Sequence, residues 1–125
     1  MRTKLIAALA APVVGLAAPA FAHHSAAMYE QAKVVTMTGT IMSFDWRNPH
    51  AKVSMVVKAA DGKAEEWGME CSTPNILARK GWSNAALMPG DKVTVTMRPM
   101  KDGSKEGLLL SIVTAKGSTL KDHDY

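Results

Sequence analysis

The segment that most constrains the fold is a long run of β-branched and apolar residues at positions 33–46. Its alternation changes face partway along, from Val35, Met37, Gly39 and Ile41 to Met42, Phe44 and Trp46. Because side chains alternate between the two faces of a strand, this switch predicts a β-bulge or sharp bend near Ile41 and Met42. Gly39 fits the same bend, since glycine permits tight coiling of a strand.

Four further strands and one short helix are expected after the bent strand. The helix starts after Thr73 as N-cap, with Pro74 at its first position and Gly81 as its terminator. Turn signals separate the strands at Asn48-Pro49, Asp61-Gly62 and Pro89-Gly90-Asp91, which places these strands at 50–59, 64–71, 93–99 and 107–115. The order β-β-β-α-β-β predicts an all-β domain with one short helix, an OB-fold-like five-stranded barrel. A five-stranded sandwich is the rival architecture.

The first 22 residues have the pattern of a cleavable secretion signal. Arg2 and Lys4 precede an apolar, alanine-rich run, and Ala20-Phe21-Ala22 fits the A-x-A cleavage pattern. The apolar run is shorter than the roughly 20 residues of a membrane-spanning helix, so we expect no membrane span in the mature chain. The expected mature protein is periplasmic. It has a polar, partly mobile N-terminal arm (23–32), the barrel (33–115) and a polar, frayed C-terminal tail (116–125).

Charge and cysteine content argue against several classes of protein. The formal net charge of +4 includes two basic residues of the signal, and the other basic residues are scattered, which argues against nucleic-acid binding. Cys71 is the only cysteine, so disulfides and paired-cysteine metal sites are absent. Its side chain is expected on the apolar face of its strand, so we interpret it as a core residue. Four methionines also lie on the apolar faces of their strands: Met37, Met55, Met69 and Met97. We interpret them as core residues rather than as a series of ligands that passes on Cu(I).

Several motifs are spread along almost the whole mature chain. They are Ala22-His23-His24-Ser25, Thr38-Gly39-Thr40-Ile41, Phe44-Asp45-Trp46, Asn48-Pro49-His50, Ser72-Thr73-Pro74-Asn75-Ile76-Leu77-Ala78-Arg79, Gly81-Trp82 and Pro89-Gly90-Asp91-Lys92-Val93. Together they resemble a family of small exported bacterial proteins known as a domain of unknown function. The resemblance implies a periplasmic location and an OB-like β-domain, and it brings no activity or site residue with it.

The histidines beside the predicted cleavage site are the main candidates for chemistry. A mature chain that begins at His23 offers an α-amine and a ring Nδ1 to one metal ion. A second imidazole, from His50 or His24, would complete three nitrogen ligands. This set resembles the histidine brace of periplasmic copper-binding proteins and copper polysaccharide monooxygenases. Planar nitrogen coordination suits Cu(II), and Met28 could add a soft ligand for Cu(I).

Simpler interpretations of the same residues stay open. The histidines at 23 and 24 can be exposed polar residues, and His50, at the start of a strand, can hydrogen-bond a loop carbonyl. Trp46 and Asn48, beside His50, instead suggest a face that contacts a ligand. The first hypothesis is therefore a non-enzymatic protein that sequesters or delivers Cu(II). The alternative is a binding or assembly module, without metal, for a peptide, a glycan or an envelope protein. A copper-dependent oxidase is a minor third reading.

Overall fold

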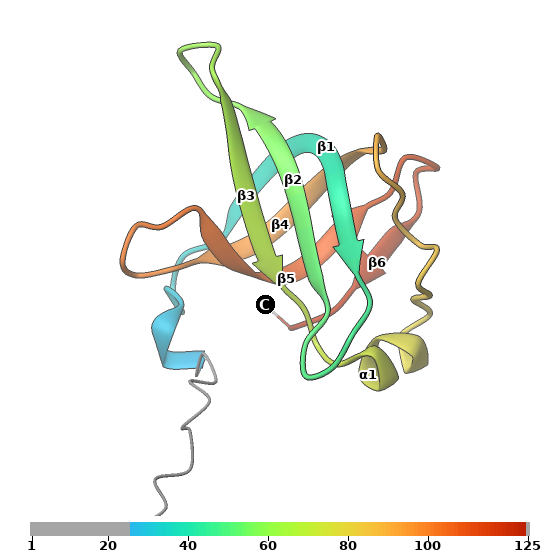
Figure 1. Cartoon of the computed structure of the whole chain (residues 1–125). Helices are drawn as coiled ribbons and strands as arrows, with labels where there is room; N and C mark the ends of the chain where they lie inside the picture. Colours follow the sequence, from blue (N-terminus) through green and yellow to red (C-terminus); the bar gives the residue numbers. More distant parts are fainter. Residues whose placement is uncertain (1–25, 125) are drawn as a thin grey trace, which may run out of the picture.

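The described chain, residues 26–124 of a computed structural model, is a closed β-barrel with one short helix (Figure 1). Its elements are η1 (Ala26–Met28), β1 (Val35–Asp45), β2 (Lys52–Lys58), β3 (Ala64–Glu70), α1 (Pro74–Arg79), β4 (Lys92–Pro99), β5 (Glu106–Val113) and β6 (Thr119–Lys121). Antiparallel pairing links β3-β2-β1-β4-β5, and a parallel pairing of β3 with β5 closes the circle. This closure confirms the predicted OB-fold-like barrel over the sandwich.

β1 bends at the predicted position. Its register with β2 shifts between Ile41 and Ser43, so Ile41 is buried whereas Met42 is exposed. A Cβ atom on Gly39 would lie 2.5 Å from the carbonyl oxygen of Val56, so this position requires glycine. The bend lets β1 pair with β4 through residues 35–40 and with β2 through residues 40–45.

The interior of the barrel is filled by side chains from every strand of the closed sheet. The methionines of β2, β3 and β4 are fully buried, and Met37 of β1 packs against the same core, as predicted. Cys71 is also fully buried, and burial raises the pKa of its thiol. The sulfur-containing side chains of the strands therefore act as packing residues.

α1 covers one end of the barrel, to the right of the β1–β2 turn in Figure 1. Pro74 occupies its first position, and Gly81, at a φ of 90°, follows its last turn, as predicted. Thr73 is at the N-cap position, but its side chain makes no capping hydrogen bond. Leu77 and Trp82 are buried in the core, which fixes the helix over the barrel end. No helix within residues 26–124 is long and apolar enough to cross a membrane.

The chain after β5 is part of the fold, so the prediction of a frayed tail is wrong. β6 pairs antiparallel with β5, and Asp122 behind it is only 1% exposed. The indole Nε1 of Trp82 donates to the carbonyl oxygen of Lys121 at 2.9 Å, and Nζ of Lys80 donates to that of Asp122. Contacts with the segment after α1, rather than a strong local signal, order these residues.

The described part of the N-terminal arm joins the barrel at Tyr29. This side chain is buried, and its backbone forms an isolated bridge with Met100. The carbonyl oxygen of Met28 accepts a hydrogen bond from the amide of Lys101 at 2.9 Å. The expectation of a partly mobile arm is therefore wrong at Tyr29, while positions 23–25 lie outside the described residues.

Candidate functional site

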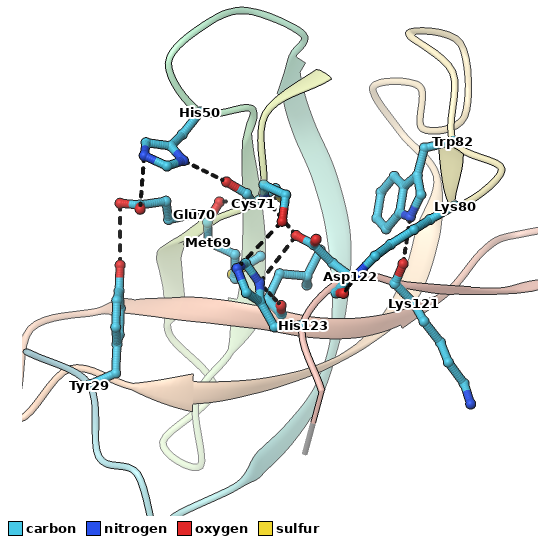
Figure 2. Close-up of polar contacts among 12 residues, drawn as sticks. Tyr29, His50, Met69, Glu70, Cys71, Lys80, Trp82, Lys121, Asp122 and His123 are labelled. Atoms are coloured by element: carbon cyan, nitrogen blue, oxygen red, sulfur yellow. Dashed lines mark hydrogen bonds and ion pairs between the residues drawn. The ribbon is translucent and has the colours of Figure 1, made fainter. Parts of the chain in front are cut away.

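Two histidines lie at one end of the barrel, each beside a carboxylate: His50 beside Glu70 and His123 beside Asp122 (Figure 2). We call Tyr29, His50 and Glu70 the open cluster, and Ser72, Asp122 and His123 the buried cluster. The two clusters flank the peptide bond between Cys71 and Ser72, just after the end of β3. Residues from four separate parts of the chain therefore meet around one peptide unit.

The open cluster is organised by a hydrogen bond to the ring of His50. Nδ1 of His50 lies 3.2 Å from the carbonyl oxygen of Cys71. Because a carbonyl oxygen only accepts, Nδ1 carries the hydrogen, and the neutral ring has its lone pair on Nε2. The simpler interpretation of His50 is thus confirmed in its geometry. The same bond also resembles the second contact that orients a histidine ligand in metal sites.

Glu70, the last residue of β3, connects His50 to the N-terminal arm. Its Oε1 lies 3.8 Å from Nε2 of His50, and its Oε2 accepts a hydrogen bond from the Tyr29 hydroxyl at 3.3 Å. Burial, and then the charge of Glu70, raise the pKa of Tyr29, so its phenol stays a donor. The side chains of His50 and Glu70 are 39% and 21% exposed. Solvent and ions therefore have access to the space between them.

The buried cluster has shorter contacts. Oδ2 of Asp122 accepts the backbone N–H of Ser72 at 2.8 Å and lies 3.3 Å from Nδ1 of His123. Nδ1 of His123 also lies 2.9 Å from the carbonyl oxygen of Leu109, and its Nε2 is 3.4 Å from Oγ of Ser72. Among the described residues, Oδ1 of Asp122 has no hydrogen-bond partner. The cluster thus holds a buried carboxylate that is bonded through one oxygen.

Hydrogen bonds determine the ionisation of the buried pair. Burial alone would raise the pKa of the Asp122 carboxyl, but the bonds from His123 and Ser72 outweigh burial and lower it. The bond to Asp122 raises the pKa of His123 by more than burial lowers it. Both shifts favour the charged forms, so the two side chains stabilise each other as an ion pair.

The atoms of the buried cluster follow the order carboxylate, imidazole, hydroxyl found in serine hydrolases. A serine nucleophile must be reachable by substrate, yet Ser72 is only 9% exposed. Three surface hollows of about 330–400 Å³ in the described part are lined by other residues. We therefore interpret this cluster as the anchor of the C-terminal segment.

The described structure contains some of the predicted site residues and not others. His23 and His24 lie outside the described residues. Met28 is 40% exposed, and Asn48 is exposed in a turn whose bond to Pro49 is cis. Of the three predicted histidine ligands, only His50 lies within the described residues, beside a carboxylate that was not among the predicted site residues.

Trp46, predicted to belong to a ligand face, is partly a packing residue. Its ring meets that of Phe44 edge-on, with centroids 5.7 Å apart and an interplanar angle of 75°. It also packs against the core while remaining half-exposed. Its indole is therefore held in place by the barrel and presents only part of its surface to a ligand.

Glu70 was not predicted as a neighbour of His50, although the sequence contains a signal for it. The hairpin at Asp61-Gly62 sets the register that pairs Lys52 with Glu70. His50 precedes Lys52 by two residues, so extending this register places it near Glu70. Asp122 carries no comparable signal, because its burial depends on contacts with the segment after α1.

The open cluster supplies two ligand atoms for a metal ion rather than a full set. Within residues 26–124, no group of three or more His, Cys, Asp or Glu side chains is placed to hold a metal ion. Ligand atoms bound to one ion at about 2.0–2.2 Å are no more than about 4.3 Å apart. The 3.8 Å between Nε2 of His50 and Oε1 of Glu70 meets this limit. A metal here needs at least one further ligand.

Comparison with known proteins identifies the family of this chain. The chain belongs to the family of unknown function DUF6152, which it matches over residues 9–111. No curated protein and no solved structure matches it.

Proposed function

We propose that the protein binds Cu(II) in the periplasm and sequesters or delivers the ion without acting as an enzyme. In this proposal, cleavage after Ala22 frees the amine of His23, which binds the ion together with its own Nδ1. Nε2 of His50 is the third nitrogen ligand, and Oε1 of Glu70 faces the same ion. His24 is the alternative source of the imidazole.

The observation that carries the proposal is the orientation of His50 towards Glu70. Since Nδ1 donates to the carbonyl oxygen of Cys71, the lone pair of the neutral ring lies on Nε2, 3.8 Å from Oε1 of Glu70. Two lone pairs that face each other repel unless a proton or a metal ion lies between them. A divalent ion bound to both atoms satisfies the imidazole and the carboxylate together.

The connection of the arm to the same carboxylate supports a contribution from the N-terminus. Tyr29 is buried and donates its hydroxyl to Glu70. Six residues of chain reach no more than about 20 Å, so His23 starts within that distance of Tyr29. The amine of His23 is therefore within reach of the open cluster.

The ligand types favour Cu(II) over other divalent ions. Nitrogen ligands in a planar set suit Cu(II), which also binds most tightly in the divalent series. The amine and the imidazole bind the ion in their deprotonated forms, so binding releases protons. One carboxylate lowers the net charge of the bound ion without adding a soft ligand.

Native mass spectrometry of the exported protein tests this proposal. After one equivalent of Cu(II), we expect a chain starting at His23 with one retained copper. A variant with one added N-terminal glycine converts the amine to an amide and should lose the ion. His50→Gln should weaken the affinity at least about 100-fold, more than the loss of an outer-shell partner.

The matched control is His123→Gln, which removes the other described imidazole and leaves the open cluster intact. It should retain copper with an affinity within about threefold of the wild type, because no ligand is lost. A different N-terminal residue, or copper binding that is indifferent to the added glycine and to His50, would reject the proposal. Ligand-induced changes at Trp46 without copper would then support the metal-free binding module.

A further inference from the structure

We infer that Asp122 is a positioning residue for His50 and acts on it through the peptide unit between Cys71 and Ser72. This inference rests on the proposed function, in which Nε2 of His50 binds the metal. It adds a residue from the C-terminal segment to a site formed by residues up to the end of β3.

The geometry is a continuous line of hydrogen bonds. Oδ2 of Asp122 accepts the N–H of Ser72 at 2.8 Å. The carbonyl oxygen at the other end of the same peptide unit, that of Cys71, accepts the Nδ1 hydrogen of His50 at 3.2 Å. Figure 2 shows this peptide unit between the two side chains. A carboxylate thus reaches the imidazole through one amide group.

The charge of Asp122 acts on the N–H of Ser72 as well as on His123. Burying a carboxylate costs free energy that a neutral amide avoids, and an Asn side chain could also accept the N–H of Ser72. Asp122 is 1% exposed, and its Oδ1 has no hydrogen-bond partner among residues 26–124. Its negative charge therefore acts mainly through Oδ2, on Ser72 and His123.

A carboxylate on the N–H of a peptide polarises that peptide. Hydrogen bonds in a chain strengthen one another, so the carbonyl oxygen of Cys71 becomes a better acceptor. A better acceptor holds the hydrogen on Nδ1 of His50 and keeps the lone pair on Nε2, the atom that faces Glu70. Metal sites commonly use a carboxylate on the non-binding nitrogen for this purpose. Here the peptide unit transmits the effect.

The first test reads the His50 tautomer in the metal-free protein by nitrogen-15 NMR, at a pH where the ring is neutral. In the wild type we expect the Nδ1–H form to dominate. In Asp122→Asn, which keeps the acceptor and removes the charge, the ratio of Nδ1–H to Nε2–H should fall about twofold or more. Asp124→Asn is the matched control. It removes the same charge from an exposed neighbour and should leave the ratio unchanged.

The second test measures copper affinity in the same proteins. Asp122→Asn should weaken binding about 10-fold, at the lower end of the range for outer-shell partners, and Asp124→Asn should not. If the wild type binds no copper, the proposed function fails, while the tautomer ratio still tests the link between Asp122 and His50. The two failures are therefore distinguishable.

Two results would overturn the inference. One is a wild-type His50 in the Nε2–H form, a measurement that needs no variant and holds even if Asp122→Asn does not fold. The other is a folded Asp122→Asn protein with the wild-type tautomer ratio.

Discussion

In the buried cluster, the carboxylate of Asp122 is enclosed and lies 2.8 Å from the N–H of Ser72. In the open cluster, Glu70 is partly exposed and lies 3.8 Å from the imidazole of His50. Both clusters combine a histidine, an acid and a hydroxyl group. Short contacts around an enclosed carboxylate stabilise the fold, whereas longer contacts between accessible groups leave room for an ion. Similar side chains can therefore stabilise the fold in one place and, in the proposed function, bind an ion a few residues away.

Removing residues 119–125 should have the largest effect on stability. The truncation deletes β6 and the whole C-terminal side of the buried cluster, including the packing of Leu120 against the core. Lost burial and the unpaired N–H of Ser72 predict a decrease of about 4 kcal/mol in the free energy of unfolding. Urea denaturation measures it. Lys121→Ala, which keeps the backbone of β6, should stay within about 0.5 kcal/mol of the wild type. Equal stability of the truncated chain would contradict the role of this segment.

Asp122→Ala tests the buried cluster alone. The substitution leaves the buried N–H of Ser72 without an acceptor, which predicts a loss of about 2–3 kcal/mol. Asp124→Ala, an exposed acid two residues further on, should change stability by less than about 0.5 kcal/mol. Urea midpoints of the three proteins give the comparison, and equal values for both variants would show that burial of Asp122 brings no stability.

The stability difference between wild type and His123→Gln should depend on pH. The folded pKa of His123 is raised, so its contribution is full below the unfolded value of about 6.5 and is lost as pH rises through the folded pKa. The pKa of Asp122 is lowered, so its contribution is present above about 3.9 and is lost as pH falls through the folded pKa. The difference should be largest between about pH 4 and 6.5.

Because His123 is partly exposed, this pH-dependent difference should stay within about 1 kcal/mol. Urea midpoints of both proteins from acidic to alkaline pH measure it. A difference that is constant with pH would mean that the two side chains do not interact as charges.

Glu70→Gln should have the smallest effect on stability. Glu70 is partly exposed and its contacts are long, so we expect a change of less than about 0.5 kcal/mol in urea. The same variant should weaken Cu(II) binding about 10-fold if Oε1 faces the bound ion. A large destabilisation without a change in Cu(II) affinity would mean that Glu70 stabilises the fold, as Asp122 does. The two clusters would then not differ in role.

Most of the barrel could be predicted because its signals are local. The alternation that switches at Ile41 and Met42 encodes the bulge, and Gly39 encodes the close approach of β1 to β2. Turn residues such as Gly62 and Gly90, both with positive φ, separate the strands where expected. These features depend on neighbours in the chain, so sequence periodicity is enough to find them.

The C-terminal segment could not be predicted in the same way. β6 contains one apolar residue, Leu120, between polar ones, and Asp122 follows as an apparently solvated acid. The contacts that bury it come from Lys80 and Trp82, and both bind backbone carbonyl oxygens, which carry no signature in the partner's residue type. The buried cluster could therefore not be predicted from the sequence, whereas His50, which follows a turn, was among the predicted site residues.

The β3–β5 pairing has a consequence for motion. It runs only through residues 68–70 and 106–108, whereas β2 and β3 pair along their full lengths. Local opening should begin where the fewest hydrogen bonds must break, so among the barrel strands amide hydrogen exchange should be fastest along this seam. Glu70 is the last residue of the seam on β3. Each opening would move its carboxylate relative to His50. In the proposed function, this movement gives the bound ion a route of release that leaves the rest of the barrel folded.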